Sequence, residues 1–249
     1  MKRLNGKIAV VTGGSSGIGF ATAKALVNEG ATVYITGRRK DALEAAAANI
    51  GAGCIPVQAD AAKQEDIKKL YEQIRSEHNR VDVVFANAGI AEYGVFGQIE
   101  EEQYERIFGT NVKGVIFGVQ AALPLMPDGG RIILNGSVVG SKGLPANSVY
   151  AATKAAVRSF ARTWTTDLKQ RKIRVNVVSP GPINTEGMEG LLGSGETGQA
   201  RRDAISSGVP LGRMGKPEEI AKAVVFLASD DASFITGSEF FVDGGFAQV

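Results

Sequence analysis

Tyr150 and Lys154 stand four residues apart in Tyr150-Ala151-Ala152-Thr153-Lys154, a stretch rich in helix-forming residues. Side chains at that spacing share one face of a helix, so a phenol and an ammonium could act on the same ligand. A free phenol has a pKa of about 10, and a neighbouring ammonium favours the phenolate. We therefore expect Lys154 to lower the pKa of Tyr150, which would suit Tyr150 to acid–base chemistry near neutral pH.

Ser137 is a third candidate, because it follows an apolar run typical of a strand, Arg131 to Asn135. Open α/β sheets bind ligands at the carboxyl ends of their strands. A hydroxyl there can donate a hydrogen bond to a substrate oxygen and stabilise charge that develops on it. Chemistry of this kind, with a proton donor and a hydrogen-bond donor, needs no metal.

A glycine cluster, Thr12-Gly13-Gly14-Ser15-Ser16-Gly17-Ile18-Gly19, follows the first apolar run of the chain. Glycines let the backbone turn sharply, and they let a pyrophosphate approach the free N–H groups at the start of a helix. The cluster alone would also fit an ordinary strand-to-helix turn. A strand before it and a helix after it favour the dinucleotide site.

The end of the second expected strand indicates which dinucleotide binds. Sites that prefer NAD usually place a carboxylate there for the ribose 2′-hydroxyl, whereas this chain has Gly37 followed by Arg38 and Arg39. Guanidinium groups match the oxygens of a 2′-phosphate. We predict NADP(H), with Arg38 as the main partner and Arg39, Ser15 or Ser16 assisting. A solvated basic start of the next helix is the plainer alternative.

The elements that must position these residues alternate between short β-branched runs and longer segments of helical periodicity. This pattern predicts one α/β domain over residues 1–249, a Rossmann fold with a doubly wound, parallel, seven-stranded sheet and helices on both faces. The expected strands are Ile8–Thr12, Thr32–Thr36, Cys54–Gln58, Val81–Ala86, Arg131–Asn135, Ile173–Val178 and Glu239–Val242. Helices are expected near residues 18–29, 40–50, 64–78, 101–126, 149–169 and 217–228.

The spacing of Gly13, Gly17 and Gly19 resembles the T-G-x-x-x-G-x-G fingerprint of the short-chain dehydrogenase/reductase family. The resemblance runs the whole length of the chain, with further matches in the family's order at Asp60, Asn87-Ala88-Gly89, Asn111, Ser137, Tyr150-x-x-x-Lys154, Pro180-Gly181 and Asp243-Gly244-Gly245. Two positions depart from it: Thr153 stands where serine is common, and Gly136 precedes Ser137 where the family often has serine.

The resemblance implies a reversible, NADPH-dependent reductase of ketones, aldehydes or 3-oxoacyl thioesters. It implies that Tyr150 is the general acid/base, that Ser137 orients the carbonyl, and that Lys154 also hydrogen-bonds the nicotinamide ribose. Asn111 would hold a water that links Lys154 to solvent. It further implies a homotetramer, because the helices near 101–126 and 149–169 pair between subunits in that family.

The cofactor site implied by the resemblance gathers residues from many strand ends. Asp60 would lie by the adenine ring, Ile183 would offer a backbone amide to the carboxamide, and Thr185 a hydroxyl. The full expected set is Gly13, Ser15, Ser16, Gly17, Ile18, Gly19, Arg38, Arg39, Asp60, Asn87, Ala88, Gly89, Tyr150, Lys154, Pro180, Gly181, Ile183 and Thr185.

A glycine-rich stretch, Gly187 to Gly198, breaks the alternation of elements. We expect the segment from Glu186 to about Ser207 to be a substrate lid, since its glycines would let it close over the site and exclude water. A disordered surface loop is the alternative. Substrate specificity is expected there and around Gly94 to Gly97.

Composition excludes several other classes of function. A net charge of +2 over 249 residues, with no like-charge run longer than Arg38-Arg39-Lys40, argues against nucleic acid as a partner. The single cysteine gives no sign of an oxidising compartment, and no apolar run reaches the roughly 18 residues of a membrane span. We expect a cytoplasmic protein that acts on a small molecule.

Two other functions use the same fold. A redox sensor or regulatory module would bind NADP without turnover, but it would not need a proton donor paired with a lysine. A dehydratase or epimerase of nucleotide sugars would keep the tyrosine and the lysine. That class usually needs a larger C-terminal region than the roughly 70 residues that follow Pro180.

Overall fold

Seven parallel strands form one sheet in the order β3-β2-β1-β4-β5-β6-β7 in the computed structural model, which describes residues 2–249. The strands are β1 (Ile8–Val11), β2 (Thr32–Gly37), β3 (Cys54–Gln58), β4 (Val83–Ala86), β5 (Arg131–Asn135), β6 (Arg174–Pro180) and β7 (Glu239–Val242). The chain crosses to the other half of the sheet between β3 and β4, so a topological switch point lies between the neighbours β1 and β4. The predicted doubly wound sheet is confirmed.

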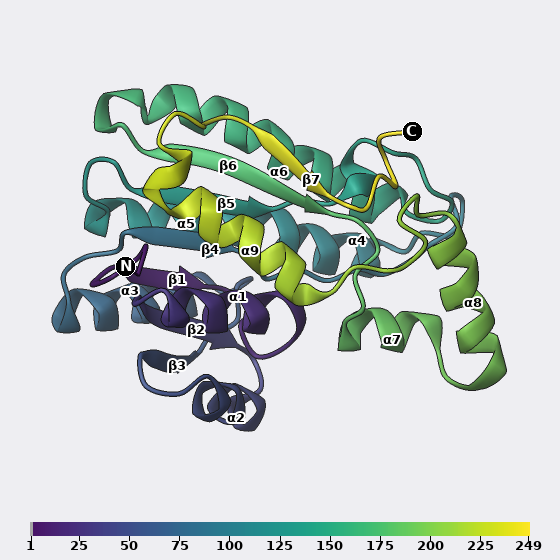
Figure 1. Cartoon of the computed structure of the whole chain (residues 1–249), viewed down its shortest axis with the longest axis horizontal. Coiled ribbons are helices and arrows are strands. Elements are labelled where there is room, and N and C mark those ends of the chain that lie inside the picture. Colours follow the sequence, from purple (N-terminus) through teal and green to yellow (C-terminus); the bar gives the residue numbers. More distant parts are fainter. Residues whose placement is uncertain (1) are drawn as a thin grey trace.

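Helices cover both faces of this sheet (Figure 1). One face packs against α1 (Gly17–Asn28), α2 (Lys40–Ile50) and α9 (Pro217–Ala228). The other packs against α3 (Gln64–Glu77), α5 (Gly114–Ala122) and α6 (Ser148–Asp167). Two hydrophobic cores result, one on each side of the sheet.

The inner strands are largely apolar because their alternate side chains enter different cores. In β1, Ala9 and Val11 pack on the side of α1, whereas Ile8 and Val10 pack on the side of α3. All four residues are buried. Burial on both faces is the condition that produces continuous apolar strands in parallel sheets.

The helix expected near residues 101–126 is divided into several pieces. It begins as α4 (Glu101–Phe108), widens into a π-helical turn at Gly109–Lys113, continues as α5 and ends in a 3-10 turn at Leu123–Leu125. Single π-helical turns inside α-helices are often found at functional sites. Here the turn contains Asn111, whose side chain is buried.

The glycine-rich segment is helical, which the sequence analysis did not predict, and the disordered loop that it gave as the alternative is not what the structure has. It forms α7 (Glu186–Leu192) and α8 (Gly195–Ser207), which lie beyond the end of the sheet in Figure 1. Thr185 caps α7 by accepting a hydrogen bond from the Met188 N–H at 3.1 Å. Gly193 and Gly195, with φ of +81° and +69°, make the turn between the two helices. The glycines therefore form the turn between two helices and not a long loop.

No helix within residues 2–249 has both the length and the apolar character that crossing a bilayer requires.

Candidate active site

A cleft of about 720 Å³ opens where the strands end. Each contributing strand supplies residues at or just beyond its carboxyl end, as in open α/β sheets generally. The remaining wall comes from Thr110 in the π-helical turn, from the start of α6, from α7 and α8, and from Phe246 in the C-terminal segment. All eighteen residues of the cofactor set given above line this cleft.

The glycine turn has the geometry of a phosphate cradle. Gly13 and Gly17 have φ of +67° and +53°, in the region that favours glycine. A Cβ at Gly19 would lie 2.1 Å from the Gly13 carbonyl oxygen, so a larger residue cannot fit. The N-cap of α1, Ser16, makes no side-chain cap, and the first turn has no acidic residue. The N–H groups that begin α1 thus suit an anion such as a pyrophosphate.

The end of β2 presents positive charge to the cleft. Arg38 and Arg39 are exposed, and within residues 2–249 neither forms an ion pair. Gly37 leaves the strand end without a carboxylate, and a Cβ there would lie 3.4 Å from the Ser15 hydroxyl oxygen. Two guanidinium groups and a hydroxyl beside a glycine are suited to a 2′-phosphate.

Ser137, Tyr150 and Lys154 come together in the same cleft from two elements. Ser137 begins the 3-10 turn Val138–Gly140 that follows β5, and its hydroxyl accepts from the Val139 N–H at 3.4 Å. Tyr150 and Lys154 lie one turn apart near the start of α6. The Lys154 Nζ lies 5.5 Å from the centre of the Tyr150 ring. The helical face expected from their spacing is therefore present.

The expected lowering of the Tyr150 pKa was wrong. Burial raises the pKa of Tyr150 to about 12, with hydrogen bonding to Ser137 acting in the opposite direction to a smaller extent. The Lys154 ammonium donates to the Asn135 carbonyl at 2.7 Å, and burial lowers the pKa of Lys154 to about 8. Tyr150 is consequently protonated near neutral pH, which is the state that a proton donor needs.

Asn111 lies behind the wall of the cleft instead of in it. Its side-chain oxygen accepts from the Ile90 N–H, and its amide donates to the Ile90 carbonyl, both at 2.9 Å. The amide also lies 3.2 Å from the Thr153 hydroxyl, which donates to the Tyr150 carbonyl at 2.7 Å. Asn111 therefore ties the segment after β4 to the start of α6. A role in a water relay stays a prediction.

A chain of amides, which the sequence did not reveal, connects the glycine turn to Lys154. Asn135 donates to the Asn87 side-chain oxygen at 2.9 Å. Asn87 in turn donates to the Thr12 and Gly13 carbonyls at 2.9 and 3.2 Å. Because Lys154 donates to the backbone of Asn135, the glycine turn and the lysine are positioned by the same residue.

Both departures from the family's pattern have a structural reason. A Cβ at Gly136 would lie 2.5 Å from the Ser179 hydroxyl oxygen and 2.6 Å from a Val177 methyl carbon, so serine cannot fit without a shift. Thr153 keeps a hydroxyl in the place of the usual serine, and its bonds to Asn111 and Tyr150 use that hydroxyl.

The substrate side of the cleft differs in part from the expectation. Around Gly94 to Gly97 the lining residue is Tyr93, and the glycines themselves do not line the cleft. The predicted lid contributes residues of both α7 and α8. Phe246 was missed, although it directly follows the Asp243-Gly244-Gly245 motif, which could have drawn attention to the C-terminal segment.

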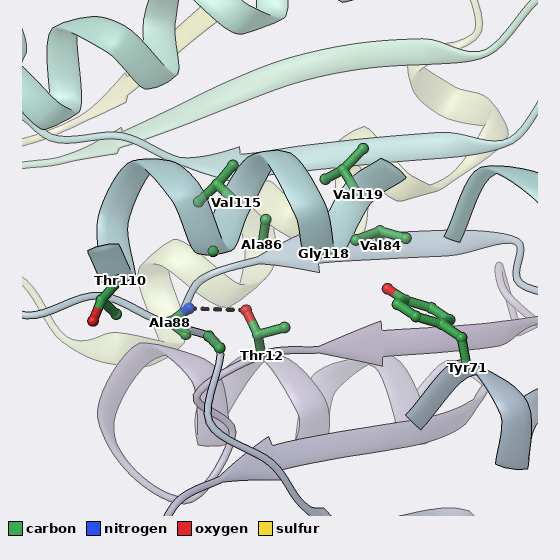
Figure 2. A pocket seen from close by; sticks show the side chains of 11 residues that line it. Thr12, Tyr71, Val84, Ala86, Ala88, Thr110, Val115, Gly118 and Val119 are labelled. Carbon is green, nitrogen blue, oxygen red and sulfur yellow. Dashed lines mark hydrogen bonds between the residues drawn. The ribbon is translucent and has the colours of Figure 1, made fainter. Parts of the chain in front are cut away.

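A second, much smaller cavity of about 10 Å³ lies behind Thr12, on the side of the sheet that faces α3 and α5 (Figure 2). Figure 2 shows the Tyr71 hydroxyl pointing in among the apolar side chains of Val84, Val115 and Val119. Such a volume holds at most one water molecule. It is therefore too small to be a second ligand site.

Comparisons with known proteins agree with this geometry over the full chain. The family model described as enoyl-(acyl carrier protein) reductase matches residues 13–247. Oxidoreductase asL5 of Sarocladium schorii is 47% identical over 251 residues, covering 100% of this chain and 99% of that protein. An NADP-dependent (R)-specific alcohol dehydrogenase of Lentilactobacillus kefiri is 39% identical, with 98% of each chain covered. A solved short chain dehydrogenase/reductase family protein matches with a TM-score of 0.89 at 40% identity, covering 99% of this chain and 100% of the other.

Proposed function

The chain belongs to the short-chain dehydrogenase/reductase family, and from that premise we propose an NADP(H)-dependent enzyme that reduces the carbonyl of a small ketone or aldehyde to an alcohol, reversibly. The observation that carries the proposal is the meeting of Ser137, Tyr150 and Lys154 in one cleft with the glycine turn. A protein that only bound the dinucleotide as a sensor would not need this group. No observation favours a dehydratase or epimerase.

The residues of the cleft divide the chemistry between them. Bound NADPH would supply a hydride to the carbonyl carbon. Tyr150, protonated at neutral pH because burial raises its pKa to about 12, gives its proton to the carbonyl oxygen. Ser137 donates a hydrogen bond to that oxygen and stabilises the charge that builds on it. Lys154 orients the ribose, and Asn111 fixes the start of α6 that carries both Tyr150 and Lys154.

The preference for NADP(H) over NAD(H) rests on the end of β2. Arg38 and Arg39 face the cleft without carboxylate partners among the described residues, and Gly37 adds no negative charge. The Lentilactobacillus kefiri relative is NADP-dependent by name. The proposed activity extends to a 3-oxoacyl thioester, because its keto group undergoes the same reduction.

Replacing the proton donor tests the proposal directly. Tyr150→Phe should lower kcat/KM for carbonyl reduction with NADPH by about 100-fold or more, while NADPH affinity, measured by the quenching of protein fluorescence, stays near that of the unmodified protein. Tyr104→Phe is the matched control, since Tyr104 lies on α4 outside the cleft. A Tyr150→Phe variant with a tenth or more of the original activity would rule out the donor role.

We also propose that the protein is a homotetramer located in the cytoplasm. In support of assembly, β7 is an edge strand of the sheet, and Phe234, shortly before it, is fully exposed. Edge strands with apolar neighbours are natural sites of pairing between chains. Sedimentation equilibrium should give four times the mass of one chain, and a mass equal to one chain would refute the proposal.

A further inference from the structure

The cleft divides into a charged half and an apolar half. Its charged side chains are Arg38, Arg39, Asp60 and Lys154. The first three follow β2 and β3, and β2 lies three strand positions from β5, roughly 14 Å away at ~4.8 Å per position. Lys154 is already bonded to the Asn135 carbonyl at 2.7 Å. Apart from Lys154, which lies one helical turn from Tyr150 on α6, the other half of the cleft is lined by no charged side chain.

The other half is formed by the segments after β4 and β5, by α7 and α8, and by the C-terminal segment. Its lining side chains are almost all apolar: Ala91, Val138, Val139, Leu144, Met188, Leu191, Leu192, Ile205 and Phe246. Burial of an apolar body against such a surface is favourable. A carboxylate placed there would lose its hydration and gain no partner, which is costly.

The helix α7 turns apolar side chains toward the cleft and keeps its charged side chains out of the lining. Met188 and Leu191, three residues apart, line the cleft, whereas Glu186 and Glu189 are exposed and do not. The two arginines of α8 are also turned elsewhere, since both donate to backbone carbonyls at the end of α7: Arg201 to Leu192 at 3.0 Å and Arg202 to Gly193 at 3.4 Å. The nearby charges are thus kept out of the lining.

Tyr93 supplies a hydroxyl at the margin of the apolar half. It lines the cleft and is 48% exposed, and its phenol is close enough to contribute to the raised pKa of Tyr150. The Tyr93 hydroxyl has no hydrogen-bond partner among residues 2–249. It is therefore available to a ligand.

The loop that carries Tyr93 is held in place by its backbone. Gln103 donates to the Tyr93 carbonyl at 3.2 Å, and the Gly94 N–H donates to the Ala146 carbonyl at 2.9 Å. Ala146 has a φ of +59°, which is uncommon and strained for alanine. Glu92 and Arg106 add an ion pair at 2.9 Å. The position of Tyr93 is thus fixed in advance of binding.

We propose that the substrate class is a neutral carbonyl compound with an apolar body, which packs between α7, α8 and Phe246, while the Tyr93 hydroxyl binds a polar group at the far end of that body. This inference rests on the proposed carbonyl reduction and names the substrates that the site selects. In the reaction the carbonyl carbon gains a hydride from NADPH, the oxygen gains the proton of Tyr150, and the products are the alcohol and NADP⁺.

A pair of substrates of similar size tests the selection against charge. 4′-Methylacetophenone and 4-acetylbenzoate differ in a methyl and a carboxylate at the far end. The neutral ketone should have a kcat/KM about 100-fold or more above that of the carboxylate, because the apolar half offers the carboxylate no charged partner, and the single hydroxyl of Tyr93 does not replace its hydration. Along methyl ketones from 2-butanone to 2-octanone, kcat/KM should rise up to about fourfold per methylene. Equal rates with the carboxylate would overturn the inference.

A charge placed on α7 tests the location of the apolar half. Met188→Lys should raise the relative kcat/KM for 4-acetylbenzoate by about tenfold or more, since it gives the carboxylate a charged hydrogen-bond partner. Glu189→Lys is the matched control: it changes the charge of the same helix by more but lies outside the cleft, and it should leave the ratio unchanged. The same change in both variants would show a general charge effect and would overturn the placement.

Tyr93→Phe tests the hydroxyl. The variant should lose about fivefold in kcat/KM for 4′-hydroxyacetophenone, whose hydroxyl can bond to Tyr93, and little for 4′-methylacetophenone. Tyr104→Phe, also a partly exposed tyrosine but outside the cleft, should affect neither substrate. Equal losses for both substrates in Tyr93→Phe would show that the hydroxyl does not select.

Binding separates a failure of this inference from a failure of the proposed function. Ketone binding to the protein loaded with NADPH can be followed by nicotinamide fluorescence without any turnover. If 4′-methylacetophenone binds more tightly than 4-acetylbenzoate but neither is reduced, the result would refute carbonyl reduction and support the substrate class. Reduction of both, with the carboxylate bound equally well or better, would refute the class and support the reaction.

Discussion

Removal of the guanidinium of Arg38 should abolish most of the proposed preference for NADPH. Arg38 is exposed, and the side chain makes no ion pair within residues 2–249, so Arg38→Ala should leave the fold intact. A unit charge pair at ~4 Å contributes about 1 kcal/mol in water and about 4 kcal/mol at an effective dielectric constant of 20. A hydrogen bond to a charged group contributes about 1.5–3 kcal/mol, and we take this range as the loss of binding free energy for the 2′-phosphate. At about 1.4 kcal/mol per tenfold, the ratio of kcat/KM with NADPH to that with NADH should fall roughly 10- to 150-fold.

The assay is steady-state reduction of one ketone with each cofactor in turn at low ionic strength, where salt screens the phosphate least. The kcat/KM with NADH should change little, because NADH lacks the 2′-phosphate. Lys40→Ala is the matched control, since it removes a positive charge two residues away that does not line the cleft. If the ratio in Arg38→Ala stayed at its original value, or fell as far in Lys40→Ala, the assignment of the 2′-phosphate to Arg38 would be refuted.

Two further predictions concern stability. Burial lowers the pKa of Lys154 from 10.5 to about 8. Between these two pH values the unfolded chain therefore binds a proton that the folded chain has released, so the free energy of unfolding rises with pH. Relative to Lys154→Met, the unmodified protein should gain up to about 3 kcal/mol of stability over this range. Thermal melting of both proteins at pH 7.5 and pH 10 measures this, and a difference that does not change with pH contradicts it. Gly136→Ser should lower the free energy of unfolding by about 1–3 kcal/mol, and with it the melting temperature, because the Cβ would lie 2.5 Å from the Ser179 hydroxyl oxygen. Gly143→Ala, which meets no atom within 4 Å, is the control, and equal melting temperatures for Gly136→Ser and the unmodified protein would refute the steric reason.

Most of the sheet could be predicted because its inner strands are largely apolar and turn residues separate the strands from the helices. Ile8 to Val11 is buried at every position, and the glycines that follow require the turn that the structure shows. The helices α7 and α8 could not be predicted in the same way. Glycines at 190, 193 and 195 lower intrinsic helix propensity, and the cap at Thr185 is recognisable only once the strand before it is known to end at Pro180.

The candidate site shows the same division between local and tertiary information. Spacing alone was enough to place Tyr150 and Lys154 on one helical face. The direction of the Tyr150 pKa was not accessible, because it depends on how deeply the fold buries the phenol, and burial outweighs the neighbouring groups. The bond from Asn135 to Asn87 joins residues 48 positions apart and carries no pattern that a sequence could show.

The π-helical turn at Gly109–Lys113 makes this part of the chain sensitive to length more than to composition. A helix advances about 100° per residue, and the wide turn accommodates an additional residue without breaking the rod. Loss of one codon there would restore a regular α-helix and leave the faces of α4 and α5 in register, but it would shift the residues of the turn itself by about 100°. Asn111 would then swing away from Ile90, whose backbone it holds through two bonds of 2.9 Å. Insertions and deletions in this turn should therefore be far less tolerated than side-chain changes at its exposed positions.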